Sequence, residues 1–273
     1  MSAFSIFGTL IHAPVCGELE VKRNALIEVD DKGQISAIYD AESKELQISK
    51  EQARNAGHLI ELTDSQYLLP GMIDLHIHAP QWPQLGQSLH LPLHQWLQQC
   101  TFPLEAKYEN VDFAELVYSS LVDTLIANGT TTALYFATIH LESSKKLADI
   151  CQHKGQRALL GKVAMDNPDQ CPGFYRDAST QQGLDDTRAL IEYIRTMKGN
   201  EDKRVLPVVT PRFIPSCTDE MLVGLGEIAR EYDCHIQTHC SESDWQHNYV
   251  IDRHGRRDTD SLDNFGLLTR KTV

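Results

Sequence analysis

The sequence predicts an α/β fold, because strand-like and helix-like segments alternate five times from Leu68 onward. The strand-like segments are short and rich in β-branched and aromatic residues, and a helix-like segment follows each of the first four. This alternation is typical of a parallel sheet. The unit spacing of roughly 30–50 residues fits either a doubly wound sheet or a (β/α) barrel.

The region before this alternation, residues 1–67, is predicted to be a small β subdomain. Strands are expected at 4–12 and 19–29, and a third at 34–40 after the turn Asp31-Lys32-Gly33. The polar segment 43–56 tolerates a helix and is expected to be a surface excursion.

The second region, residues 68–273, is predicted to contain the alternating strands and helices. Strands are expected at 68–78, 131–138, 157–165, 205–213 and 234–242. Helices are expected at 110–128, with Gly129 as the C-cap, and at 143–154, 184–198 and 218–232. The aromatic-rich segment 94–102 is expected to pack in the core rather than to bind a cofactor.

Composition excludes several classes of protein. The 273 residues carry 25 Lys and Arg against 38 Asp and Glu, a net charge of −13, which argues against nucleic-acid binding. No apolar run approaches the ~18 residues of a membrane helix, and the first residues lack the basic region of a signal peptide. Seven cysteines without a Cys-x-x-Cys pair predict reduced thiols in a cytoplasmic protein.

The first candidate for chemistry is the segment Asp74-Leu75-His76-Ile77-His78. Histidines at i and i+2 of a strand point to the same face, so His76 and His78 can bind one metal ion. The alternative is an ordinary pair of half-buried histidines.

The second candidate is His239-Cys240-Ser241-Glu242, at the end of the fifth expected strand. In a parallel barrel the active site lies at the carboxyl ends of the strands, where both histidine segments fall. Catalytic zinc commonly takes three protein ligands, with imidazole favoured, so His239 offers a ligand and Glu242 an acid/base group. The alternative for Glu242 is a carboxylate on a surface loop.

The segment Pro70–His78 resembles the opening strand motif of the amidohydrolase superfamily, PG-x-x-D-x-H-x-H, which there follows a small β subdomain. Further segments resemble the branch of that superfamily that deaminates guanine; they are 91–115, 128–140, 155–166, 209–213 and 235–242. The resemblance implies a (β/α)8 TIM-type barrel. About five units of it, the first five to six strands, fall within residues 68–273.

The resemblance also implies functions for individual residues. His76, His78 and His239 would bind one zinc ion, and Glu242 would be the catalytic proton shuttle. The substrate-binding residues would be Gln81, Arg212, Phe213 and His239. The implied reaction is the hydrolysis of guanine to xanthine and ammonia in purine catabolism, by a cytoplasmic homodimer that binds neither nucleic acid nor membranes.

The superfamily pattern continues with a further histidine and a metal-ligating aspartate, which the resemblance places beyond Val273. The chain is therefore expected to be the first part of a longer enzyme, truncated before the last metal ligand, and to be inactive alone.

Two other functions stay open. The substrate could be another amino-heterocycle, such as a triazine or a pyrimidine. The chain could also be a non-catalytic scaffold that keeps the fold and has lost the metal, although the intact set of His76, His78, His239 and Glu242 favours the enzyme.

Overall fold

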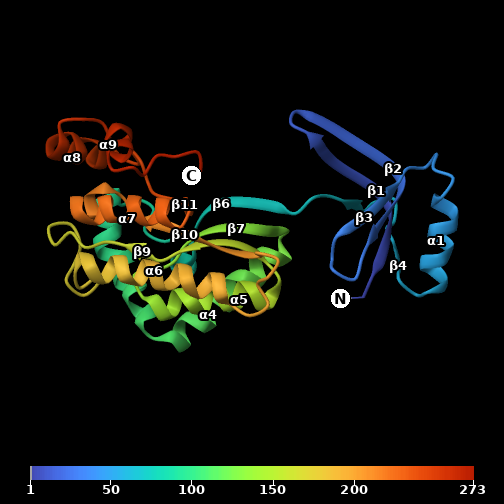
Figure 1. Ribbon diagram of the computed structural model, residues 1–273, viewed down its shortest axis with the longest axis horizontal. Coiled ribbons are helices and arrows are strands. Elements are labelled where there is room, and N and C mark those ends of the chain that lie inside the picture. The colour runs from blue at the N-terminus through green and yellow to red at the C-terminus, as the bar shows by residue number, and fades with distance from the viewer. Residues whose placement is uncertain (1) are drawn as a thin grey trace. The chain divides into compact units, whose positions relative to one another are not determined.

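The computed structural model describes residues 2–273 and divides into two compact units, with the boundary between Gly71 and Met72 (Figure 1). The family resemblance and the alternating pattern concern the second unit, which carries every candidate site residue. The identity of the first unit as part of a composite sandwich and a domain boundary after residue 67 stay predictions.

The first unit is a sheet in the order β3-β2-β1-β4, with β5 also paired to β1. The β1–β2 and β2–β3 pairs are antiparallel, whereas β4 and β5 lie parallel to β1. The segment expected to be a polar excursion contains helix α1. The elements are β1 (Phe4–Val15), β2 (Glu18–Val29), β3 (Ile35–Tyr39), α1 (Leu46–Asn55), β4 (Leu59–Glu61) and β5 (Tyr67–Leu68).

The second unit is built on a parallel sheet in the order β11-β10-β8-β7-β6, with β9 paired to β10. Each strand lies beside the one that precedes it in the chain, and the direction of addition never reverses. A doubly wound sheet reverses direction, whereas a barrel does not, so this order is that of a barrel segment. The strands are β6 (Met72–His78), β7 (Thr130–Phe136), β8 (Arg157–Gly161), β9 (Val163–Ala164), β10 (Val205–Pro211) and β11 (His235–Ile236).

Helices α4, α5 and α6 lie along one side of this sheet and pack on its strands (Figure 1). Leu121, Leu147 and Leu190, one from each helix, meet the strand residues Leu160 and Val205 in a common core. Burial of each such side chain stabilises the fold by roughly 1.5–3 kcal/mol. The longer helices are α4 (Val111–Ala127), α5 (Leu141–Lys154), α6 (Thr180–Thr196), α7 (Asp219–Glu231), α8 (Asp244–His254) and α9 (Asp258–Asn264).

The boundaries of helix α4 have a clear physical cause at each end. The side chain of Asn110 accepts hydrogen bonds from the amides of Asp112 and Phe113 and so begins α4. Gly129, at a φ of 91°, follows the end of this helix. The four helices predicted from the sequence are confirmed, with ends displaced by a few residues.

Two predicted strands are interrupted. The segment 68–78 is wrong as one strand, because Pro70 has no amide hydrogen to donate and β5 and β6 belong to different sheets. The segment 157–165 is broken at Lys162, whose ammonium lies in the interior 2.6 Å from a carboxylate oxygen of Asp177. A buried charge requires a partner, and the break between β8 and β9 lets Lys162 reach it.

The fifth predicted strand, 234–242, is also too long, because β11 comprises His235 and Ile236 alone. The residues after Ile236 stay beside β10, and the Gln237 amide donates to the carbonyl of Val209. Ser241 then adopts a φ of 53°, in the left-handed region that a strand does not use.

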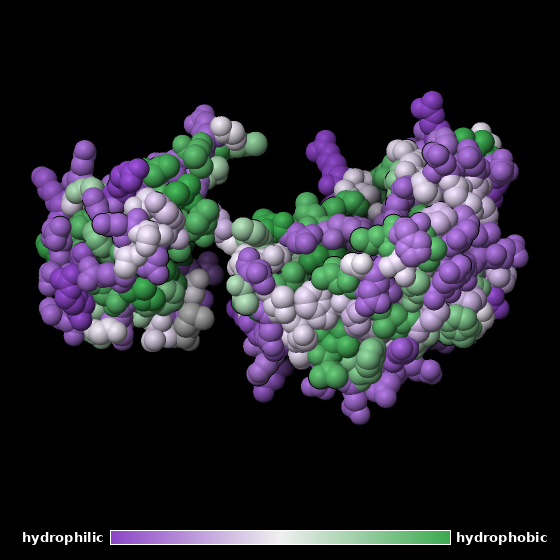
Figure 2. Space-filling view, turned by 180° about the vertical axis from the view of Figure 1, so that it is seen from behind, coloured by the Kyte–Doolittle hydropathy of each residue, from purple (hydrophilic) through white to green (hydrophobic). Residues whose placement is uncertain are grey.

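In the space-filling view, apolar side chains show between polar ones on the surface of both units (Figure 2). Ile35 and Ile38 are exposed on the first unit, and Met72 and Ile73 on the second. Within residues 2–273, no helix combines the length and apolar content that crossing a membrane requires.

We expect Gly161→Ala to destabilise the second unit, because the sheet has no room for a methyl group there. A Cβ at this position would lie 1.8 Å from Thr210 Oγ1 and 2.5 Å from the carbonyl oxygen of Val208. Overpacking of this kind costs about 1–3 kcal/mol, which a lower midpoint of urea unfolding would measure. Gly173→Ala is the control, since no other atom lies within 4 Å of the place its methyl group would take. Equal midpoints for the two variants would contradict the prediction.

Candidate active site

Three histidines from the two ends of the sheet meet at one point. His76 and His78 lie at i and i+2 of β6, and His239 follows β11. The Nε2 atom of His239 lies 2.9 Å from that of His78 and 3.3 Å from that of His76. In a flat sheet of this order, with strands ~4.8 Å apart, β6 and β11 would be separated by roughly 19 Å. The sheet therefore curls strongly, as a barrel wall does.

The three imidazoles fit a metal ion. Their ligand nitrogens all lie within 4.8 Å of one another. Burial lowers the pKa of His78 well below its usual value, and burial lowers that of His239 to about 4. Both rings are therefore neutral at pH 7, which is the form that binds metals. A hydrogen bond between two Nε2 atoms would join only two of these rings. A metal cation could bind the Nε2 atoms of all three.

The orientation of His239 supports the same interpretation. Its Nδ1 atom lies 2.6 Å from the carbonyl oxygen of Arg212. Because a carbonyl can only accept, Nδ1 carries the hydrogen and the Nε2 lone pair points toward His76 and His78. Metal-binding histidines are commonly held in this way through their second nitrogen.

A cavity of about 110 Å³ adjoins the histidines. Pockets for drug-sized ligands measure roughly 300–1,000 Å³, so this cavity suits a small molecule. All of the site residues predicted from the sequence line it, as do three residues that were not predicted. The predicted residues are His76, His78, Gln81, Arg212, Phe213, His239 and Glu242, and the others are Leu93, Trp96 and Leu97.

Arg212 is held from behind the cavity by a buried carboxylate. Its guanidinium donates to Glu105, with Nη1 2.5 Å from Oε2 and Nη2 3.3 Å from Oε1. Gln81 donates its Nε2 to the same Oε1 atom at 3.0 Å. Burial disfavours the charged form of Arg212, but the charge and hydrogen bonds of Glu105 raise its pKa above the usual value. The guanidinium therefore stays a fixed cation at the cavity wall.

The position of Glu242 depends on a turn with an unfavourable backbone conformation. Ser241, the residue before it, has a φ of 53°, which costs a residue with a side chain roughly 1–2 kcal/mol. The Ser241 amide donates to Asp258 Oδ2 at 2.8 Å, and Gln246 donates to the same oxygen at 2.7 Å. Gln246 also donates to the carbonyl of His239 at 3.3 Å. Asp258 and Gln246 thus hold the turn that joins His239 to Glu242.

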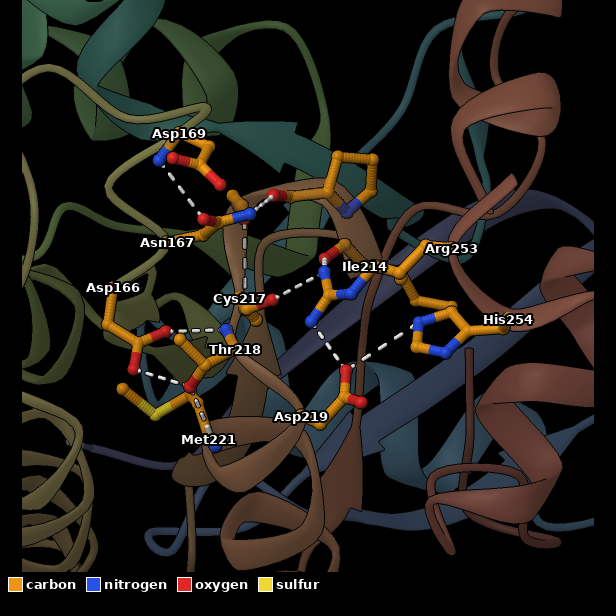
Figure 3. A network of polar contacts seen from close by, with 12 residues as sticks. Asp166, Asn167, Asp169, Ile214, Cys217, Thr218, Asp219, Met221, Arg253 and His254 are labelled. Atoms are coloured by element: carbon orange, nitrogen blue, oxygen red, sulfur yellow. Dashed lines mark hydrogen bonds and ion pairs between the residues drawn. The ribbon is translucent and has the colours of Figure 1, made fainter. Parts of the chain in front are cut away.

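Helix α8, which begins at Asp244 two residues after Glu242, is anchored to the segment that follows β10 by a polar network (Figure 3). Arg253 of α8 donates to the carbonyl oxygens of Ile214 and Cys217 and pairs with Asp219. On the other side of this network, Asp166 accepts from the amide and hydroxyl of Thr218. The network fixes α8, and with it the turn, relative to Arg212.

The carboxyl of Glu242 is suited to proton transfer. It lines the cavity and remains accessible to solvent. Partial burial raises its pKa above the usual value, and the charge of Arg212 opposes this rise. A carboxyl whose pKa moves toward neutrality both accepts and returns a proton more readily near pH 7.

Comparison with known proteins agrees with this geometry. Residues 67–273 match the Amidohydrolase family. The chain belongs to the amidohydrolase family. The one-directional strand order of the second unit agrees with this family.

Several relatives of this amidohydrolase chain are guanine deaminases. The guanine deaminase of Homo sapiens is 40% identical over 97% of this chain and 58% of that protein. That of Dictyostelium discoideum is 38% identical over 97% of this chain and 60% of that protein. The crystal structure of guanine deaminase from C. acetobutylicum, with bound guanine in the active site, superposes with a TM-score of 0.88. It is 31% identical and is matched over 99% of this chain and 61% of that one. The chain thus spans less than two thirds of the length of these relatives.

Sequence reasoning did not assign Leu93, Trp96 or Leu97 to the cavity, and it missed two buried carboxylates near it. Trp96 was expected in the core, yet it lines the cavity, and its Nε1 has no hydrogen-bond partner among the described residues. Glu105 and Asp258 were missed because both act through other residues. The aromatic-rich segment 94–102 could have pointed to Trp96 as a cavity residue. No local sequence pattern distinguishes Glu105 or Asp258 from other acidic residues.

Asp258→Ala should destabilise the turn before Glu242, since it leaves the Ser241 amide and the Gln246 side chain without their acceptor. Gln246 is buried, and an unsatisfied buried donor costs about 1–3 kcal/mol, so a clear fall in the thermal unfolding midpoint is expected. Asp260→Ala is the matched control, because Asp260 also lies in the first turn of α9 but is exposed. If both variants unfold at the same temperature, Asp258 does not support the turn.

Proposed function

We propose that this chain carries the metal site and substrate pocket of a zinc-dependent hydrolase that converts guanine to xanthine and ammonia. The observation that carries the proposal is the convergence of three histidines, Glu242, Arg212 and Gln81 on one small cavity. The guanine deaminases among the relatives, one of them with guanine bound, support the choice of substrate.

His76, His78 and His239 would hold the zinc ion through their Nε2 atoms. When bound, zinc supplies Lewis acidity that makes hydroxide available at neutral pH. The hydrogen bond from His239 Nδ1 to the Arg212 carbonyl keeps one ligand in the required tautomer before the ion arrives.

Glu242 carries the proton in this proposal. Attack of water on the ring carbon releases a proton, and the departing amine requires one. A single carboxyl beside the reacting carbon meets both needs, first as base and then as acid. General acid–base catalysis of this kind contributes roughly 10²–10⁴-fold.

Arg212, Gln81 and Phe213 bind the base. The guanidinium of Arg212 is a planar donor that does not deprotonate, which suits the carbonyl oxygen of guanine. Phe213 is 4% exposed and lines the cavity, where it offers an apolar surface to a planar ring. The cytoplasmic location and the homodimer stay predictions.

The proposal is tested by incubating the full-length, zinc-loaded protein with guanine and with a panel of other amino-heterocycles, and by following ammonia release and xanthine formation. Turnover confined to guanine is the expected result. Turnover of a triazine or pyrimidine in its place would identify another hydrolase, and a protein that binds no zinc would be a scaffold.

His76→Ala should weaken zinc binding at least ~100-fold, because the loss of a residue that merely supports a ligand already costs about 10–100-fold. Elemental analysis after dialysis measures the zinc retained per chain. His153→Ala is the control, because His153 is exposed on α5 and remote in sequence from the cluster. Near-stoichiometric zinc in the His76 variant would contradict its assignment as a ligand.

Glu242→Gln should keep zinc and lose turnover by roughly 10²-fold or more, since an amide has the same shape but cannot accept the proton. The kcat for guanine and the zinc content are measured on the same sample. Glu220→Gln, at an exposed position of α7, controls for the loss of one surface charge. A Glu242 variant within about tenfold of the unmodified protein would mean that another group moves the proton.

A further inference from the structure

We propose that Glu105 is a positioning residue that sets the hydrogen-bonding polarity of the cavity and thereby selects the base that binds there. It makes Gln81 present an acceptor and Arg212 a donor to the ligand. This inference rests on the proposed function and deepens it, because it names the feature of the substrate that the pocket recognises.

Glu105 lies outside the cavity but contacts two residues of its wall. It ends the short helix α3 (Phe102–Glu105) and is 0% exposed. One oxygen, Oε2, accepts from Arg212 at 2.5 Å, and the other, Oε1, accepts from Gln81 at 3.0 Å and Arg212 at 3.3 Å. The ring of Phe102, whose centroid lies 5.0 Å from the guanidinium carbon, covers Arg212 from the side.

The charge of Glu105 decides which way the Gln81 amide faces. A carboxylate paired with a guanidinium can only accept hydrogen bonds, so the amide must turn its NH₂ group toward Glu105. The carbonyl oxygen of Gln81 is then the acceptor left for a ligand. Without the carboxylate, the two ends of the amide could exchange at little cost, and Gln81 would offer either group.

The resulting pattern of one acceptor beside one donor matches a lactam edge. In guanine, a ring N–H that donates adjoins a carbonyl that accepts. In 2,6-diaminopurine the same edge is reversed, because the ring nitrogen accepts and the adjoining amino group donates. Both bases carry an amino group at the same reacting carbon. A mismatched edge leaves buried polar groups unpaired, and sites of this kind discriminate by up to roughly 10⁴–10⁵-fold.

Stability alone does not account for this arrangement. A buried ion pair is often no more stable than apolar side chains of the same volume, because both charges lose their hydration. Glu105 also accepts a third hydrogen bond, from Gln81, that a role in packing Arg212 would not require. The geometry points to control of the cavity wall.

The test is the ratio of kcat/KM for guanine to kcat/KM for loss of the 2-amino group from 2,6-diaminopurine, measured on the full-length, zinc-loaded protein. In Glu105→Gln, the new amide still accepts from Arg212 but can also donate to Gln81. The side-chain amide of Gln81 can then turn round and present its NH₂ group to the ligand. We expect the ratio to fall at least 100-fold while zinc content is unchanged. Glu109→Gln, an exposed carboxylate one helical turn further on, should leave the ratio unaltered.

A second variant covers the case in which Glu105→Gln does not fold. Gln81→Leu keeps the Glu105–Arg212 pair and removes the acceptor, so it should lower the same ratio by a similar factor. An unchanged ratio in a folded, zinc-loaded Glu105→Gln variant, or in Gln81→Leu if that is the variant that folds, would overturn the inference.

Failure of the proposed function gives a different result. If the full-length, unmodified protein does not deaminate guanine, equilibrium binding of guanine and 2,6-diaminopurine replaces the kinetic ratio. Preference for guanine that disappears in Glu105→Gln would support the inference and refute the proposed reaction. Equal binding of the two bases by the unmodified protein would overturn both.

Discussion

The position of Arg212 is the constraint on which both halves of the site depend. Its carbonyl oxygen accepts from His239 Nδ1 at 2.6 Å and so directs the other nitrogen of that ring toward the metal position. Its guanidinium, 2.5 Å from Glu105, forms part of the cavity wall. One residue directly after β10 therefore couples the orientation of the His239 ring, a candidate metal ligand, to that of a hydrogen-bond donor in the cavity wall. A displacement of this strand end would disturb both together.

The topology of the sheet places Arg212 where it can do this. Strands added in one direction curl, and the curl brings the first and last strands of the segment, β6 and β11, within reach of each other. The close approach of β8 to β10 at Gly161 belongs to the same curvature, since a side chain larger than hydrogen would push the two strands apart. The fold thus does more than carry the site, because a flat sheet with the same residues could not assemble it.

The sequence predicted those parts of the site that a local pattern encodes. The spacing of His76 and His78 marks one face of a strand, and four of the helices carry a recognisable start or stop. The strand ending at Glu242 was predicted too long, because a left-handed φ at Ser241 leaves no trace in residue type. Glu105 could not be found in this way either, since its partner Arg212 lies 107 residues further along the chain and no periodicity links them.

The residues that escaped prediction share a physical character. Glu105 and Asp258 are both buried carboxylates that do not line the cavity, and each accepts hydrogen bonds from groups adjoining it. Burying a carboxylate is unfavourable unless donors compensate for the lost water, so each carboxylate holds its donors in one arrangement. For Asp258 the donors are the Ser241 amide and Gln246, and the arrangement includes a backbone conformation that Ser241 would not adopt alone. The precision of the site therefore comes from polar groups placed behind it, where desolvation makes their hydrogen bonds strong and any alternative arrangement costly.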